Sequence, residues 1–144
     1  ARAMDALERG AEKSGRSVDA LDRPQLVVCS VHEDRSTALD MARNMVTQYL
    51  GQQPHIMEAS GVPKSLLEAV GEVLTWPATH EQVEAASKLI PDEIVQMLTA
   101  SGTAAEAREA VAGYMSNGCT SPVLYPLGDV YATIDAFADW DGSG

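Results

Sequence analysis

His32 is the side chain of this sequence best suited to proton transfer, because imidazole titrates near neutral pH. It lies in the segment Ser30-Val31-His32-Glu33-Asp34, directly after an apolar run, and could donate a proton to a substrate or accept one. The structural alternative is that His32 only caps or hydrogen-bonds its own loop. Glu33 and Asp34 are better explained as the acids of a helix start, where negative charge is favoured. His32 is therefore the catalytic candidate of this segment, and both interpretations stay open.

The histidines do not predict a metal site. His32, His55 and His80 lie 23 and 25 residues apart and have no cysteine or acidic partner at ligand spacing. The acidic residues near the C-terminus are spaced too loosely for a calcium loop. No serine, cysteine and histidine combination has the spacing of a nucleophile and its base. We therefore expect no metal and no covalent catalysis from these residues.

The segment Ser101-Gly102-Thr103 offers a second kind of chemistry. It begins a helix, and the free backbone N–H groups of a helix start can hold a phosphate. However, it lacks the glycine spacing of Walker and Rossmann loops. Thr103 and Glu106 also fit the capping box Thr-x-x-Glu. Ordinary capping is the preferred interpretation, and phosphate binding is the alternative.

Strand-like and helical patterns alternate along the chain. Apolar runs at 25–31 and 119–125 lack a clean alternation, which predicts strands buried on both faces of a parallel sheet. Helical patterns cover 2–14, 35–50, 66–74, 81–89, 91–99, 103–116 and 130–137. The predicted fold class is α/β, with two visible strands. Two parallel strands do not make a stable sheet alone, so we expect a piece of a larger fold or an assembly of chains.

The composition excludes several classes of function. The chain has 144 residues, which suits one domain, and a formal net charge of −11 without any lysine or arginine cluster. Nucleic acid is therefore not an expected partner. No apolar run reaches the length of a membrane span, and no signal peptide is visible, so we expect a cytoplasmic protein. Cys29 and Cys119 lie in apolar contexts and are expected to be free thiols.

Several segments, in this order and spacing, resemble the luciferase-like monooxygenase superfamily, in particular the coenzyme F-420-dependent branch related to methylenetetrahydromethanopterin reductase. The segments are Val27 to Arg35, Ala38 to Arg43, Tyr49-Leu50-Gly51, Pro91-Asp92, Ala100 to Glu106, and Gly118 to Gly128. The unit Ser-Gly-Thr-x-x-Glu, followed by a helix, a glycine and an apolar strand, carries most of the resemblance.

The resemblance implies a partial (β/α)8 TIM barrel. Residues 1–139 would form its C-terminal portion, with 25–31 as the seventh strand, 119–125 as the eighth and about 52–90 as a helical insertion. Residues 140–144 would form a flexible tail. Active sites of such barrels lie at the carboxyl ends of the strands. The substrate and cofactor mouth would then include these residues: Ser30, His32, His55, Tyr125, Leu127 and Gly128.

The implied chemistry is hydride transfer to or from an organic substrate by coenzyme F-420 or FMN in the parent enzyme. The family places most cofactor contacts on earlier strands, so we expect no coenzyme on this chain alone. The expected partners are a small-molecule substrate and the rest of the barrel, or another chain, to complete the sheet. We also expect a homo-oligomer. The alternative is a short, non-catalytic binding or assembly protein derived from the barrel, which completes its sheet by oligomerising.

Overall fold

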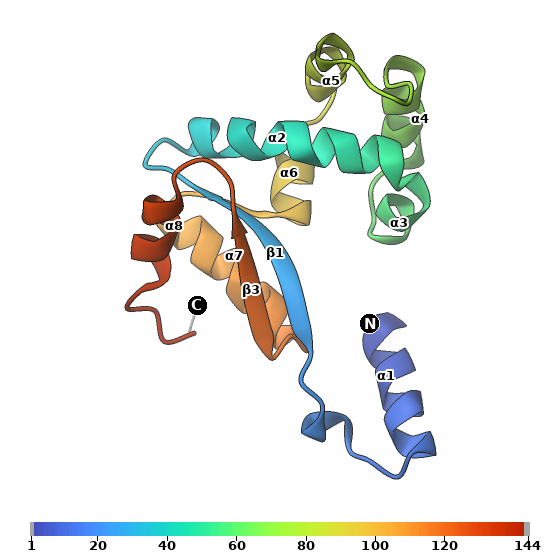
Figure 1. Cartoon of the computed structure of the whole chain (residues 1–144), viewed down its shortest axis with the longest axis vertical. Helices are drawn as coiled ribbons and strands as arrows, with labels where there is room; N and C mark the ends of the chain where they lie inside the picture. Colours follow the sequence, from blue (N-terminus) through green and yellow to red (C-terminus); the bar gives the residue numbers. More distant parts are fainter. Residues whose placement is uncertain (1, 143–144) are drawn as a thin grey trace.

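The computed structural model describes residues 2–142 and has an α/β fold (Figure 1). The strands are β1 (Pro24–Val31), β2 (Ala100–Gly102) and β3 (Ser121–Pro126). The α-helices are α1 (Arg2–Lys13), α2 (Arg35–Gln52), α3 (Pro54–Ala59), α4 (Lys64–Val73), α5 (His80–Ser87), α6 (Asp92–Leu98), α7 (Ala104–Ser116) and α8 (Val130–Phe137). A 3-10 helix, η1 (Val18–Ala20), precedes β1.

The three strands form one parallel sheet in the order β2-β1-β3. The predicted pairing of the two longer strands is confirmed, because β1 and β3 pair in parallel from Pro24↔Ser121 to Cys29↔Pro126. The expectation of only two strands is wrong. Ala100–Gly102 forms a third strand, which pairs with the last three residues of β1. Three residues are too few for a hydrophobic period, so the sequence pattern does not reveal this strand.

The two faces of the sheet have different surroundings. Side chains alternate along β1, so Val27, Cys29 and Val31 share one face and pack into a core with α7 and α8. Leu26 and Val28 share the opposite face, where they line a hollow together with residues of α2. The helices α7 and α2 therefore approach the sheet from opposite sides.

Helix α2 organises the larger core. Asp34 caps its start by accepting a hydrogen bond from the backbone N–H of Ser36 at 3.2 Å, as predicted. Its buried residues are Ala38, Leu39, Ala42, Val46, Thr47 and Leu50. Apolar side chains of α4 and α6 and of the segments beside them pack against this face. The helices predicted near 66–74, 81–89 and 91–99 are thus confirmed, while the role of 52–90 as a barrel insertion stays a prediction.

The two ends of the chain pack differently. Figure 1 shows α1 lying apart from the sheet, with its contacts to the rest near the start of β1. Asn117 and Gly118 end α7 as predicted, and Gly118 adopts φ +104°, which favours glycine. In the predicted tail, Trp140 packs edge-on against Phe137 with ring centroids 5.4 Å apart. The rest of that tail includes residues 143 and 144, which lie outside the described part of the chain.

Candidate functional site

The carboxyl ends of the three strands meet at one edge of the sheet, and two backbone hydrogen bonds join them. The His32 N–H donates to the Gly102 carbonyl at 3.2 Å, and the Leu127 N–H donates to the Cys29 carbonyl at 2.7 Å. The segments that follow the strands therefore lie side by side. This edge brings together the predicted residues around His32, Thr103 and Leu127, and we refer to it as the carboxyl edge.

His32 is exposed at the carboxyl edge, and its orientation is set by its own loop. The backbone N–H of Asp34 donates to Nδ1 of His32 at 3.0 Å. Since Nδ1 accepts this bond, the neutral ring carries its proton on Nε2. Nε2 is then the atom that can donate to a substrate. The loop contact proposed as the structural alternative is present, and it leaves the second nitrogen for chemistry.

The start of α7 is a closed capping box. The Thr103 N–H donates to Oε2 of Glu106 at 2.8 Å, and the Glu106 N–H donates back to the Thr103 hydroxyl at 3.4 Å. The hydrogen bond from the Thr103 backbone N–H lowers the pKa of Glu106 most. The hydrogen bond from Arg35 lowers it further. Thr103 is therefore the helix cap, as predicted, whereas Ser101 and Gly102 belong to strand β2.

The closed capping box affects whether a phosphate can bind at the start of α7. The Glu106 carboxylate occupies the place where a phosphate oxygen would accept the Thr103 N–H. A methyl group added at Gly102 would come within 2.6 Å of Oε2 of Glu106, so the carboxylate also fills the space above this glycine. While the box is closed, the described residues at Ser101-Gly102-Thr103 do not fit a phosphate-bearing group. Phosphate binding there stays untested.

Two arginines tie this edge to the helices around it. Arg35 donates to Glu106 at 2.9 Å, to Asp92 at 3.2 Å and to Gln96 at 2.9 Å. Arg43 donates to Asp92 at 2.6 Å and to the Ile90 carbonyl. These contacts join α2, α6 and α7. The side chain of Arg43 is only 15% exposed, so this part of the network is the better protected one.

The network was not predicted from the sequence. Arg35 and Arg43 lie eight residues apart and therefore on about the same face of a helix. That spacing is the available signal, but the acids they pair with lie far away along the chain. Hydrogen bonds from Arg43 lower the pKa of Asp92. Both guanidinium groups are engaged by carboxylates, so an incoming anion would have to compete with Asp92 and Glu106.

The hydroxyls near the strand ends form a buried strip. Thr99 Oγ1 lies 2.7 Å from the Val95 carbonyl and 2.8 Å from Ser101 Oγ. Since a hydroxyl has one proton and a carbonyl cannot donate, Thr99 donates to Val95 and accepts from Ser101. Ser30 lies beside Ser101 in the register, is 0% exposed, and has no hydrogen-bond partner for its Oγ among the described residues. A role for Ser30 at the mouth stays a prediction that requires its surroundings to open.

The segment after β3 closes over the start of α2. Tyr125 is 45% exposed, and Leu127 packs against the α2 core. Gly128 has φ +74°, and a methyl group added there would come within 2.3 Å of the Met41 sulfur. This turn therefore requires glycine. The three predicted residues lie at or beside the carboxyl edge, as the order of the strands requires.

His55 lies far from the other predicted residues. It is exposed on α3, which follows the carboxyl end of α2, whereas His32 precedes the start of α2 (Figure 1). The 18 residues of α2 extend over roughly 27 Å at 1.5 Å per residue. The structure therefore does not bring His55 to the carboxyl edge, and its predicted contact with substrate or cofactor remains untested.

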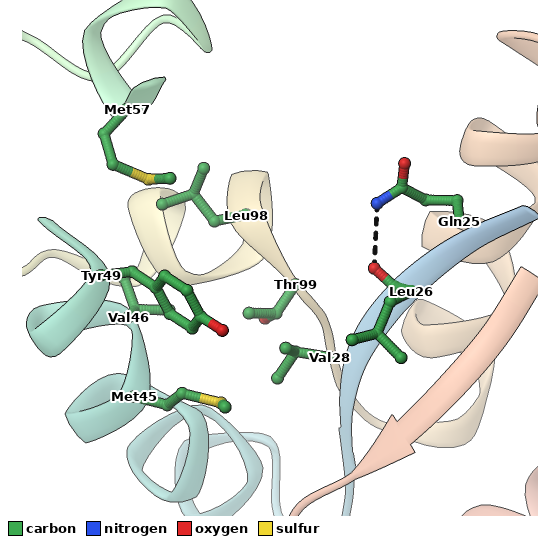
Figure 2. Close-up of a pocket in the computed structure, with 9 residues that line it drawn as sticks. All are labelled: Gln25, Leu26, Val28, Met45, Val46, Tyr49, Met57, Leu98 and Thr99. Carbon is green, nitrogen blue, oxygen red and sulfur yellow. Dashed lines mark hydrogen bonds between the residues drawn. The ribbon is translucent and has the colours of Figure 1, made fainter. Parts of the chain in front are cut away.

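An apolar hollow of about 250 Å³ lies between β1 and α2. Figure 2 shows Met45, Tyr49 and Met57 on one side of it and Leu26 and Val28 on the other. Leu26 is 58% exposed and Tyr49 is 42% exposed, so much of this apolar surface faces outward. The hollow lies along the middle of β1, below the carboxyl edge. The hollow extends from the exposed face of the sheet, on which Leu26 lies, to α2.

The remaining side chains offer less for catalysis or for binding a metal. Burial raises the pKa of the Cys29 thiol to about 11, so it stays protonated and unreactive. Among residues 2–142, no three histidine, cysteine or acidic side chains are grouped so that they could hold a metal ion. None of the described helices has both the length and the apolar character needed to cross a membrane.

Known proteins are similar to this chain in sequence and in fold. The sequence profile of the luciferase-like monooxygenase family matches residues 1–121. The 5,10-methylenetetrahydromethanopterin reductase of Archaeoglobus fulgidus is 29% identical over 128 residues, which are 88% of this chain and 39% of that protein. The solved coenzyme F420-dependent tetrahydromethanopterin reductase of Methanopyrus kandleri matches with a TM-score of 0.64 and 18% identity, over 83% of this chain and 33% of that one.

The likeness extends over most of this chain but only part of each relative. The chain spans about two fifths of the length of the Archaeoglobus reductase and one third of the Methanopyrus enzyme. Its parallel sheet and surrounding helices resemble part of the reductase barrel, as the family resemblance implies. With 121 of 144 residues inside the profile match, the chain belongs to the luciferase-like monooxygenase family.

Proposed function

We propose that this chain forms the C-terminal part of a coenzyme F-420- or flavin-dependent oxidoreductase that transfers hydride to or from a small organic substrate. The observation that carries the proposal is the family match over residues 1–121. The names of the two relatives, both reductases, support the class of reaction. A cytoplasmic location and completion of the barrel by further strands belong to the same proposal.

Within this proposal the chain contributes one side of the substrate mouth. The coenzyme, held mainly by other strands, would supply the hydride chemistry. His32 would hold or move a proton through Nε2, because Nδ1 is occupied by the Asp34 N–H. Tyr125 and Gly128 would shape the mouth beside it. The closed capping box at Thr103 argues against a phosphate group at that helix start.

The test starts from the native gene product in its source cell. Its intact mass and bound coenzyme are measured first, and hydride transfer is then assayed with coenzyme F-420 and with FMN. A general acid or base contributes roughly 10²- to 10⁴-fold, so we expect His32→Ala to lower kcat by a factor in this range. Glu33→Ala, at the neighbouring exposed position, is the matched control and should leave kcat nearly unchanged. A native protein without coenzyme and without hydride transfer would refute the proposal.

A second candidate function is a non-catalytic assembly protein derived from the barrel. The observation that favours it is the exposed apolar face of the sheet, where Leu26, Val123 and Tyr125 are 58%, 49% and 45% exposed. Such a face marks an interaction surface in many proteins. A native mass near 15.3 kDa without coenzyme would support this candidate over the oxidoreductase.

A further inference from the structure

The loop between β1 and α2 is fixed at both of its ends. At its start, the His32 N–H donates to the Gly102 carbonyl at 3.2 Å, so the backbone of His32 is tied to strand β2. At its end, Arg35 donates to Glu106 at 2.9 Å and to Asp92 at 3.2 Å, so the first residue of α2 is tied to α7 and α6. The backbone between these two points therefore has little freedom to move.

Within this loop, the same local contact occurs twice. Nδ1 of His32 accepts a hydrogen bond from the backbone N–H of Asp34, two residues ahead, at 3.0 Å. The carboxylate of Asp34 accepts in turn from the backbone N–H of Ser36, again two residues ahead, at 3.2 Å. Side chains that accept from the backbone two residues on form a tight local turn. The N–H that holds the imidazole therefore belongs to the residue that caps α2.

The Asp34 carboxylate is itself held by side-chain hydroxyls. Thr37 Oγ1 lies 2.7 Å from one of its oxygens, and Ser36 Oγ lies 3.0 Å from both. Since an ionised carboxylate only accepts, the hydroxyls are the donors. These bonds, that from Thr37 first, lower the pKa of Asp34, so the cap keeps its charge at neutral pH. The first turn of α2 thus fixes the Asp34 side chain, and the backbone N–H of the same residue is fixed with it.

We propose that Asp34 is the positioning residue of His32. By capping α2 it holds its own N–H against Nδ1, which leaves Nε2 of the exposed ring as the nitrogen that carries the proton. The catalytic part of this inference rests on the proposed function, in which His32 acts on the substrate, whereas Asp34 touches no reacting atom and acts through the ring. A donor that is already oriented when the substrate arrives needs no further ordering in the transition state.

Nuclear magnetic resonance measures the ring contact directly on the native gene product labelled with nitrogen-15. A hydrogen bond from an amide to an imidazole nitrogen gives a scalar coupling between the two nitrogens, here the Asp34 amide and Nδ1 of His32. The spectra are recorded at about pH 8, above the ordinary pKa of imidazole. We expect the coupling in the wild type and in Asp34→Asn, because asparagine caps a helix about as well as aspartate. We expect the coupling to be lost in Asp34→Ala.

Kinetics test whether the position of the ring matters for the reaction. Asp34→Ala should lower kcat roughly 10- to 100-fold, because a misplacement of about 1 Å can cost 100-fold. Asp34→Asn should keep most of the wild-type kcat. In the His32→Ala background, Asp34→Ala should lower kcat no further, since Asp34 acts through the ring. The matched control is Thr79→Ala, which removes the cap of α5 and should leave kcat unchanged.

The two measurements separate the positioning role from the proposed function. If the native protein transfers no hydride, the oxidoreductase proposal fails, and the nitrogen–nitrogen coupling still decides whether Asp34 holds the ring. A wild type without the coupling, or a folded Asp34→Ala variant that keeps it, would overturn the positioning role. So would an equal loss of kcat from Asp34→Ala with and without His32, because the effect would then come from the stability of the fold. If Asp34→Ala does not fold, the spectra of the wild type and Asp34→Asn decide.

Discussion

Replacing Glu106 by alanine should show whether the start of α7 is a helix cap. The change removes the acceptor of the Thr103 N–H and the closest carboxylate partner of Arg35. Losing the N-cap side chain itself costs about 0.5–2 kcal/mol, and Glu106 supplies the reciprocal bond of the same capping box. The ion pair adds little, because both side chains are partly exposed to water. We therefore expect Glu106→Ala to lower the free energy of unfolding by about 1–2 kcal/mol.

Urea unfolding followed by far-ultraviolet circular dichroism measures this change. The matched control is Glu109→Ala, an exposed glutamate on the same helix, for which we expect a change within about 0.5 kcal/mol. Thr103→Ala removes the other half of the box, so the double variant should lose less than the sum of the two single losses. Equal midpoints for Glu106→Ala and Glu109→Ala would refute the capping argument.

Three further predictions concern stability and reactivity. Hydrogen bonds from Arg43 lower the pKa of Asp92, and hydrogen bonds from Thr103 lower the pKa of Glu106. The two ionised carboxylates therefore stabilise the fold above their ordinary pKa values of 3.8 and 4.5, and this stabilisation is lost as the pH falls below them. The urea midpoint should drop in that pH range. The Cys29 thiol, with a pKa of about 11, should resist alkylation at pH 8 until urea unfolds the chain, and rapid alkylation in buffer would contradict its burial. Leu39→Ala should cost about 2–5 kcal/mol, because Leu39 is 0% exposed in the α2 core, and Leu89→Ala, at 41% exposure, should cost clearly less in the same unfolding assay.

Elements with a long hydrophobic period were predictable from the sequence. Helix α8 begins and ends at the predicted residues, Val130 and Phe137, and the capping signals at Asp34 and Thr103 are both correct. These features depend on neighbours within a few positions along the chain. A capping residue and its partner N–H lie two or three residues apart, so the sequence contains the whole interaction.

Features that depend on distant contacts were not predictable in the same way. Strand β2 exists because Ala100–Gly102 lies beside the end of β1, and its three residues show no pattern of their own. The contacts of Arg35 extend to Asp92 and Glu106, which are 57 and 71 residues away. The distance of His55 from the carboxyl edge follows from the length and direction of α2. Each of these outcomes is decided by packing, which a single sequence does not display.

The charged residues are distributed unevenly along the chain. The sequence has 31 charged residues, yet Asp129 is the only one between 110 and 134. This stretch contains β3 and the start of α8, where Val123, Tyr125 and Tyr131 are 49%, 45% and 77% exposed. Exposed apolar side chains without charges around them are typical of an interface core. Val123 and Tyr125 lie on the face of the sheet that Leu26 shares, whereas Tyr131 belongs to α8 on the other face, so a partner would meet these side chains as two separate surfaces.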